Sequence, residues 1–409
     1  MSCRCERRRV WSAGAWAQWR MLHRTAIGAG DAIGPESIVE QEDATVVVPA
    51  GWCRRVRAAG TIVLEREGRS PPAAWGHARC TSPSRRPGRR RTEDPGTVFV
   101  HVAIDTNTHR AAPPLSTSVV EAIGGTPLLA IEGVYAKLEY LNPSGSVKAR
   151  LAGYMIGRAE AEGLITPGDT IVEASSGNTG NAMSMVAAAK GYRMLVVMPE
   201  GMSPERVAIS RAHGADVLLI GDFHVTAALE HARILGERPG YFHPGQFDSE
   251  WNVIENRDWL GAEILEQLPA PPDALVAGVG TGGTLIGVGQ AFRAVNPDVL
   301  ILGLEPGESR TICCGEIALH AIEGIADGFV PGIIARHRSE IGDMVSVTSD
   351  EAVAEMRRLA REHGIFVGPS SGAHMLAAKR LRSERPDLRT IVTLFCDEGE
   401  KYIADHHVR

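Results

Sequence analysis

The 409-residue chain has no uncharged apolar run long enough to cross a bilayer, so the sequence does not predict a membrane protein. It also lacks the long apolar stretch of a secretory signal near its start. Its seven cysteines form no CxxC pair and no Cys/His spacing typical of zinc, and an odd number of thiols cannot all pair in disulfides. We therefore predict no metal site and a reducing compartment, the cytoplasm.

Lysine is absent from residues 1–112, which contain 18 arginines and 11 acidic residues and so carry a net charge of +7. Because the whole chain carries −6, the remainder carries −13, and this asymmetry suggests two segments of different origin or role. The basic start is compatible with a targeting peptide, but we favour an extension without such a role. The arginine run at 85–91 lacks interleaved aromatic residues, which favours a solvated linker over nucleic-acid binding.

Composition divides the chain into segments. Residues 30–66 alternate β-branched and polar side chains between turn residues, which predicts short strands. Residues 67–115 are rich in Pro, Arg, Ser and Gly and are typical of a disordered linker, and a disordered basic extension is expected over 1–29. From about residue 116, continuous apolar strands alternate with helical patterns, which predicts parallel sheets covered on both faces and thus an α/β fold.

Small residues surround one lysine in the stretch "LNPSGSVKAR" (141–150). Ser144, Gly145 and Ala149 leave room near Lys148, whereas most lysines lie among other charges on a solvated face. An amine in such a setting is suited to covalent chemistry with a carbonyl compound.

Two further loops lie at predicted strand-to-helix junctions. In "SSGNTG" (175–180), small side chains expose backbone N–H groups to a carboxylate or phosphate, although a polar helix cap is the alternative. In "GVGTGGT" (278–284), glycines let the backbone approach a phosphate closely. Since this loop also matches GxGxxG, and Glu305 ends the next strand, a dinucleotide-binding oxidoreductase is an alternative from another functional class.

A third polar loop, "GPSSGAH" (368–374), precedes a helical pattern, and Ser370 or Ser371 either caps that helix or offers a hydroxyl to a ligand. One ligand accounts for all these features if it has an aldehyde for Lys148, a phosphate for the glycine loop, and a ring whose edge meets Asn178 and a serine. Pyridoxal phosphate is such a ligand.

The same motifs, with "GGTPLL", "EGIADGFVPG" and "DEGEKY", occur in the order and approximate spacing of a known family. Residues 117–405 resemble the cysteine synthase and cystathionine β-synthase family of fold-type II pyridoxal-phosphate enzymes. The resemblance implies a tryptophan synthase β-like fold with two three-layer αβα domains and mostly parallel sheets. The larger, cofactor-binding domain would comprise residues 116–141 and 253–409, and the smaller, mobile substrate domain residues 142–252.

The resemblance also implies roles for individual residues. Lys148 would bind the cofactor covalently and then move the α-proton of the substrate, Asn178 would hydrogen-bond the ring hydroxyl, and Ser370 would meet the pyridine nitrogen. The phosphate would be held by Gly280, Thr281, Gly282, Gly283 and Thr284. The substrate carboxylate would be held by Ser175, Ser176, Gly177, Thr179 and Gln246.

The activity that this resemblance implies is formation of L-cysteine from an O-activated L-serine and sulfide by a homodimer. Cystathionine formation, cysteine desulfhydration and diaminopropionate synthesis are alternatives that use the same cofactor. The sequence departs from the family at Ala149, at Ser249 and over residues 256–264, which leaves the activated serine and the nucleophile open. Residues 30–66 separately resemble the C-terminal tail of a hydantoinase/oxoprolinase subunit, without its catalytic part.

Overall fold

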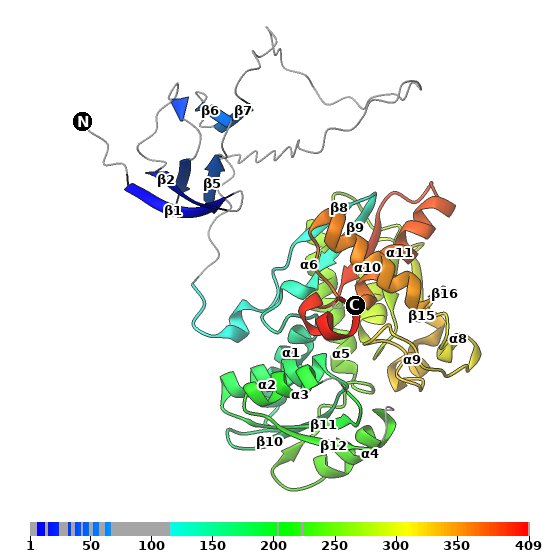
Figure 1. Ribbon diagram of the computed structural model, residues 1–409. Coiled ribbons are helices and arrows are strands. Elements are labelled where there is room, and N and C mark those ends of the chain that lie inside the picture. Colours follow the sequence, from blue (N-terminus) through cyan, green and yellow to red (C-terminus); the bar gives the residue numbers. More distant parts are fainter. Residues whose placement is uncertain are drawn as a thin grey trace. The chain divides into compact units, whose positions relative to one another are not determined.

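The computed structural model describes residues 115–202, 204–221 and 225–407, and in the N-terminal part it describes only the backbone of seven strands. The chain divides into two compact units, Met1–Pro114 and Leu115–Arg409. Figure 1 shows the second unit in cyan to red. None of the described helices is long and apolar enough to span a membrane.

The N-terminal unit contains two small sheets, in the orders β1-β2-β4-β5 and β3-β6-β7. The strands β1 and β2 form an antiparallel hairpin in the range for which the sequence predicts a disordered extension, so the structure differs from that prediction here. The predicted linker falls almost entirely outside the described residues. The strands of this unit are β1 (Glu6–Ser12), β2 (Ala15–His23), β3 (Ala32–Ile33), β4 (Ser37–Gln41), β5 (Ala44–Val48), β6 (Trp52–Val56) and β7 (Ile62–Arg66).

A six-stranded sheet of order β16-β15-β14-β17-β9-β8 forms one half of the second unit. All neighbouring strands are parallel except β8 and β9, which form a hairpin at one edge. Strand β17 is the last of the described strands in the sequence, but it lies inside the sheet, between β14 and β9. All five of its residues are buried. The strands are β8 (Leu128–Ile131), β9 (Val134–Leu138), β14 (Ala274–Gly278), β15 (Leu300–Pro306), β16 (Asp343–Val347) and β17 (Ile391–Phe395).

A four-stranded parallel sheet of order β12-β11-β10-β13 forms the other half. Its strands are β10 (Thr170–Ala174), β11 (Arg193–Pro199), β12 (Asp216–Ile220) and β13 (Tyr241–Phe242). Strand β10 is buried along its whole length, as expected for a continuous apolar strand with helices on both faces. This confirms the predicted α/β class, while the division into a cofactor domain and a mobile domain stays a prediction.

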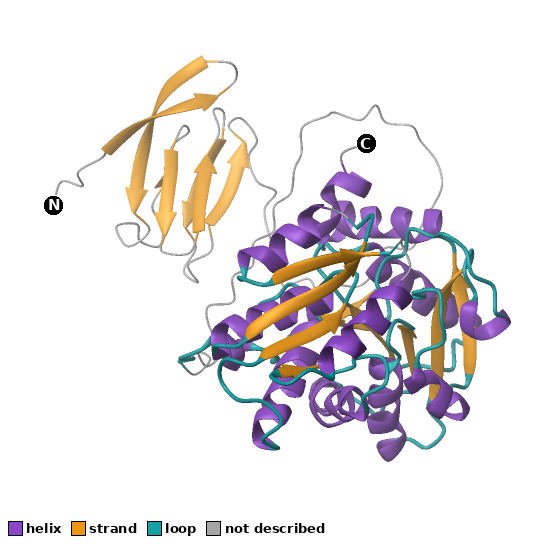
Figure 2. Ribbon diagram, turned by 90° about the horizontal axis from the view of Figure 1, so that it is seen from below, coloured by secondary structure: helices purple, strands orange, loops and turns teal. Residues whose placement is uncertain are grey.

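Helices surround the strands of both sheets (Figure 2). Helices α1 to α4 belong to the half of the unit that contains the smaller sheet, and helices α5 to α11 belong to the half that contains the larger sheet. The helices are α1 (Lys148–Ala161), α2 (Asn178–Lys190), α3 (Pro204–Ala212), α4 (Val225–Gly236), α5 (Glu250–Glu255), α6 (Ala262–Gln267), α7 (Gly283–Val295), α8 (Thr311–Cys314), α9 (Gly332–His337), α10 (Ser349–His363) and α11 (Pro369–Glu384). A π-helical turn, η4 (Asn256–Gly261), joins α5 to α6, and the 3₁₀ turn η6 (Gly399–Tyr402) follows β17.

Buried charges hold helix α1 against the larger sheet. The Arg150 guanidinium, which is fully buried, donates to Glu139 at 2.7 Å and to Glu263 at 2.9 Å. Lys137 on β9 also donates to Glu263, at 2.5 Å. Close to this network, burial raises the pKa of the Glu255 carboxyl to about 8, so that this side chain is largely protonated at pH 7. These charged residues do not line the pocket described next, and they fix the start of α1, which carries Lys148.

Candidate active site

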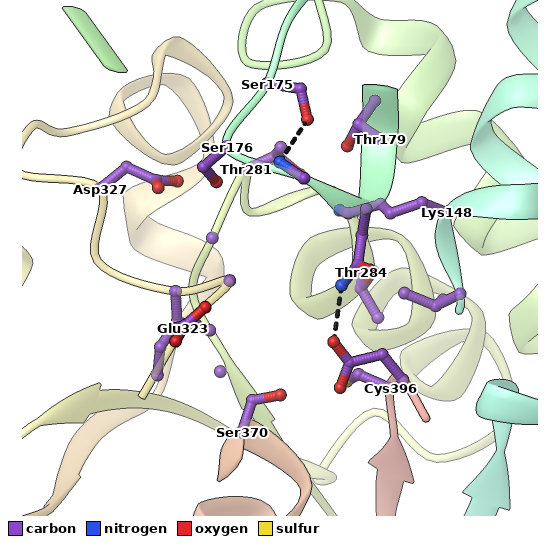
Figure 3. Close-up of a pocket in the computed structure, with 18 of the residues that line it drawn as sticks. Lys148, Ser175, Ser176, Thr179, Thr281, Thr284, Glu323, Asp327, Ser370 and Cys396 are labelled. Atoms are coloured by element: carbon purple, nitrogen blue, oxygen red, sulfur yellow. Dashed lines mark hydrogen bonds between the residues drawn. The ribbon is translucent and has the colours of Figure 1, made fainter. Parts of the chain in front are cut away.

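A pocket lies where loops from the two sheets meet (Figure 3). The structure brings twelve of the thirteen predicted site residues to its walls. They are Lys148, Ser175, Ser176, Gly177, Asn178, Thr179, Gln246, Gly280, Thr281, Gly282, Thr284 and Ser370. The thirteenth, Gly283, begins α7 behind the loop, where a Cβ atom would lie 2.0 Å from the Asn252 amide oxygen.

The backbone around Lys148 is held by the C-terminal segment of the chain. The Val147 N–H donates to the Cys396 carbonyl at 2.8 Å, and Ser146 forms a β-bridge with Asp397. Within the described part of the chain, no hydrogen bond or ion pair engages the Lys148 amine. Burial lowers the pKa of this amine, although Cys396 and Asp327 act in the opposite direction. An uncommitted amine with a lowered pKa is a suitable nucleophile and proton carrier.

The loop after β10 turns sharply around the Ser175 hydroxyl. This oxygen accepts the N–H groups of Gly177 at 3.0 Å and Gly180 at 2.9 Å, which fixes the start of helix α2 (Figure 3). The Thr179 hydroxyl donates to the Gln246 side-chain oxygen at 2.6 Å. The Gln246 side-chain nitrogen in turn donates to the Ala174 carbonyl at the end of β10, at 2.8 Å. Two sets of hydrogen bonds, one around Ser175 and one around Gln246, thus hold this loop at the N-terminus of a helix, where anions are favoured.

The loop between β14 and α7 has space only for glycine at two positions. A Cβ atom on Gly280 would lie 2.4 Å from the Gly324 carbonyl oxygen. Gly282 has a φ of 91°, a backbone conformation that side chains disfavour. The Thr281 hydroxyl accepts a hydrogen bond from Asn252 at 2.9 Å, which ties the loop to α5. Because the glycines leave backbone N–H groups exposed at the start of a 13-residue helix, this loop is suited to binding a phosphate.

Ser370 lies in the first turn of α11 and is 4% exposed. The cap of that helix is Gly368, without a side-chain capping bond, so the alternative that Ser370 caps the helix is wrong. Its neighbour Ser371 instead accepts the Cys396 N–H at 3.0 Å. The Ser370 hydroxyl makes no hydrogen bond to another described residue, and because Ser370 lines the pocket, this hydroxyl is available to a ligand.

His374 lines the pocket, although it is not among the site residues that the sequence predicts. Its Nε2 accepts the Gly278 N–H at 2.6 Å, and its Nδ1 donates to the Leu394 carbonyl at 2.8 Å. Burial lowers the pKa of the imidazole to about 4, so the ring is neutral at pH 7 and keeps one tautomer. His374 thereby fixes the first residue of the glycine loop. In the sequence, the feature that could have indicated this role is an imidazole that follows the small residues of "GPSSGAH" at the start of a predicted helix.

A polar network from the C-terminal segment supports Asn178. The Asn178 amide donates to Asp397 at 2.6 Å and accepts from Lys401 at 3.1 Å, and the Tyr402 hydroxyl also donates to Asp397. The second carboxylate oxygen of Asp397 is buried and has no hydrogen-bond partner in the described structure. Burial and the adjacent carboxylate raise the pKa of Tyr402 well above its ordinary value, which keeps its proton in place.

Arg206, on helix α3, spans the pocket and was also missed. It donates to the Ser176 carbonyl at 3.0 Å, pairs with Glu323 and lies over the Tyr402 ring at 5.7 Å. Its side chain packs so closely on the loop that a Cβ atom on Gly177 would lie 2.9 Å from the Arg206 Cδ. Arg206 therefore links the loop of the smaller sheet to the segment that follows β15 in the larger one.

These groups fit a flat molecule with an aldehyde and a phosphate. An uncommitted amine, a free serine hydroxyl and a bare glycine loop at a helix start line one pocket. The donor set suits a pyridine ring with a hydroxyl, an aldehyde and a phosphate, as in pyridoxal phosphate.

Comparison with known proteins agrees with this fit. The family described as "Pyridoxal-phosphate dependent enzyme" matches residues 119–397. A cysteine synthase of Staphylococcus aureus is 42% identical over 298 residues, 70% of this chain and 95% of the relative. An O-ureido-L-serine synthase of Streptomyces lavendulae is 40% identical over 300 residues, 71% of this chain and 92% of the relative.

Solved structures show the same similarity. The O-acetylserine-dependent cystathionine β-synthase of Helicobacter pylori matches with a TM-score of 0.68 and 32% identity, covering 72% of this chain and 99% of that structure. The family match begins at residue 119 and does not include residues 30–66. The resemblance of that segment to a hydantoinase tail is without support.

Proposed function

Because the chain belongs to the pyridoxal-phosphate-dependent enzymes and is of the cysteine synthase type, we propose that it replaces the leaving group of an O-activated L-serine by sulfide, forming L-cysteine. The observation that carries this proposal is the uncommitted amine of Lys148 facing a carboxylate-binding loop and a phosphate-binding loop in one pocket. The oxidoreductase alternative is wrong, since the chain belongs to the pyridoxal-phosphate-dependent enzymes.

The residues that line the pocket would have separate roles in binding the cofactor. Bound pyridoxal phosphate withdraws electrons from the α-carbon of an amino acid. The glycine loop of residues 280–284 and the start of α7 would hold its phosphate, Asn178 and Ser370 would orient its ring, and Lys148 would anchor it. His374 and Asp397 support this arrangement by fixing Gly278 and Asn178 respectively.

Lys148 would then move a proton. Its lowered pKa favours a neutral amine, and a neutral amine at Nζ can take the α-proton of the substrate. The N–H groups of the loop that follows β10 would bind the substrate carboxylate and so position that proton. Gln246, bonded to Thr179 and to the Ala174 carbonyl, holds this loop in place.

The names of the relatives support a family of related activities. Relatives are named cysteine synthase, O-ureido-L-serine synthase and O-acetylserine-dependent cystathionine β-synthase, and all three names are consistent with addition of a nucleophile to an activated serine. Among such nucleophiles, sulfide is the one that we propose for this chain.

A spectral titration of the yellow holoenzyme tests the proposal. We expect the visible absorbance to change on addition of O-acetylserine or O-phosphoserine and to return when sulfide is added, with L-cysteine released. Serine without an activating group should leave the spectrum near its starting state. A colourless protein that needs a nicotinamide cofactor, or a spectrum unaffected by any activated serine, would refute the proposal.

We further infer that the enzyme acts as a homodimer in the cytoplasm. The resemblance to cysteine synthases and the odd number of cysteines support this inference. Sedimentation of the purified holoenzyme measures the assembly, and a monomer at micromolar concentration would contradict it.

A further inference from the structure

Two cysteines lie side by side on the surface, outside the pocket. Cys313 and Cys314 end helix α8 (Thr311–Cys314), and both are exposed. Their sulfur atoms are 3.0 Å apart. Between residues 115 and 407 the one other cysteine is Cys396, which lines the pocket and is partly buried. The proposed function uses neither surface thiol.

The backbone holds this pair in place. The Glu305 carboxylate, 1% exposed at the end of β15, accepts the N–H groups of Ile312 at 2.6 Å and Cys313 at 3.0 Å. After Cys314 the chain turns at Gly315, whose φ is 72° and whose N–H donates to the Thr311 carbonyl. A ligand that needs both sulfurs would therefore lose little conformational entropy in binding them.

Two side chains of opposite charge lie near the sulfurs, and they pair with each other. The Arg310 guanidinium, which precedes the helix, is paired with Glu316 at 2.7 Å. The Cys314 thiol donates to the Cys313 sulfur, and this hydrogen bond raises the pKa of Cys314. In the part of the chain that the structure describes, no group of three His, Cys, Asp or Glu side chains could hold a metal ion. A four-ligand zinc site is thus not available among the described residues, whereas a pair of adjacent thiols is.

We propose that Cys313 and Cys314 form a binding site for soft, thiophilic centres that take two thiolates, such as trivalent arsenic. Thiolates bind a metal at about 2.3 Å, so two sulfurs 3.0 Å apart can share one central atom. Thiolates also prefer soft centres. With phenylarsine oxide, two S–As bonds form, the two S–H bonds and the As–O bond break, and the oxygen leaves with both thiol protons as water. Arsenic stays trivalent, so no oxidant or reductant is needed.

The sequence makes the test specific. Trypsin cleaves after Arg310 and after Arg336, and residues 311–336 contain Cys313 and Cys314 but no other cysteine, lysine or internal arginine. The full-chain holoenzyme is treated with one equivalent of phenylarsine oxide, digested and analysed by mass spectrometry. We expect this peptide to carry one phenylarsenic group and to have no thiol that reacts with N-ethylmaleimide.

The single variants Cys313→Ser and Cys314→Ser are the matched controls, because each keeps one thiol and the same helix. We expect each to bind phenylarsine oxide about 10²-fold more weakly, since the second bond is then lost. A dithiol competitor should release the arsenic from the native protein, and an equal concentration of a monothiol should not. Single variants that bind as tightly as the native chain, or arsenic found only on other peptides, would overturn the proposal.

Discussion

The amine of Lys148 is the side chain on which the proposed chemistry depends most directly. We expect Lys148→Ala to lower turnover by at least about 10²–10⁴-fold, the usual contribution of an acid–base group, because no other amine lines the pocket to move the α-proton. Turnover of O-acetylserine with sulfide, measured beside circular dichroism, checks this. Lys190→Ala is the control, since Lys190 pairs with Glu160 at 2.6 Å outside the pocket. Normal turnover in Lys148→Ala would contradict the assignment.

Ser370 and Ser371 form a matched pair on one turn of α11. Ser370→Ala should leave the fold intact and remove the one hydrogen bond to the cofactor that we propose for this hydroxyl, worth about 0.5–1.5 kcal/mol. Ser371→Ala should instead lower the free energy of unfolding by about 1–3 kcal/mol, because it leaves the Cys396 N–H unpaired. Absorbance spectra and thermal melts of both variants separate the two effects. If Ser370→Ala changed only the melting temperature, Ser370 would have a structural role alone.

Arg206 is expected to position the substrate loop without touching the reacting atoms. Arg206→Ala removes the hydrogen bond to the Ser176 carbonyl, so KM for the amino-acid substrate should rise more than kcat falls. In a double-mutant cycle with Glu323→Gln, we expect a coupling of about 0.5–3 kcal/mol, because the two side chains form an ion pair. Arg211→Ala, on the exposed side of α3, is the control. Additive effects would show that the pair does not act as a unit.

At the scale of the elements, the buried carboxyl of Glu255 at the end of α5 gives stability an uncommon pH dependence. Its pKa is raised from 4.5 to about 8 by burial, so the folded state keeps a proton that the unfolded state has lost. The contribution of this protonated carboxyl to the free energy of unfolding is fully present below pH 4.5, and it is lost as the pH rises to about 8.

We therefore expect Glu255→Gln, which cannot ionise, to be more stable than the native enzyme near pH 8 and to show a flatter stability profile between pH 5 and about 8. Urea unfolding at several pH values measures this. Glu266→Gln, on the exposed side of α6, is the control and should follow the native profile. Equal profiles for the native chain and Glu255→Gln would mean that Glu255 is ionised in the folded state.

The elements also show what the sequence can and cannot predict. The alternation of apolar strands and helices predicts two parallel sheets, because each buried strand is continuous in the sequence. The loops at 175–180 and 278–284 are predictable because they follow such strands. The roles of Asp397 and Arg206 are not, because Asn178 and Asp397 are 219 residues apart and no local periodicity brings them together. The hairpin of β1 and β2 lies in an Arg-rich segment that composition predicts to be disordered.

At the scale of the whole molecule, the two compact units separate at Pro114 and Leu115. The family match covers residues 119–397, which lie in the second unit, and the predicted site residues lie there as well. A chain that starts near Ala112 should fold, form the dimer and bind pyridoxal phosphate as the full chain does. Sedimentation, thermal melting and cofactor content of both chains test this. Insolubility or loss of cofactor in the shorter chain would show that the N-terminal unit belongs to the enzyme.

The position of β17 inside the larger sheet has a consequence for synthesis on the ribosome. Strands β9 and β14, its two neighbours, leave the exit tunnel long before Ile391–Phe395 is translated. Until then the growing chain carries two partial sheets with unpaired facing edges, and such edges pair readily with other chains. Asp397 and Tyr402, which line the pocket, follow this strand in the sequence, so the pocket is completed only after both residues have left the exit tunnel. A premature stop a few codons before Ile391 would therefore yield a chain that aggregates or is degraded, with no partial activity.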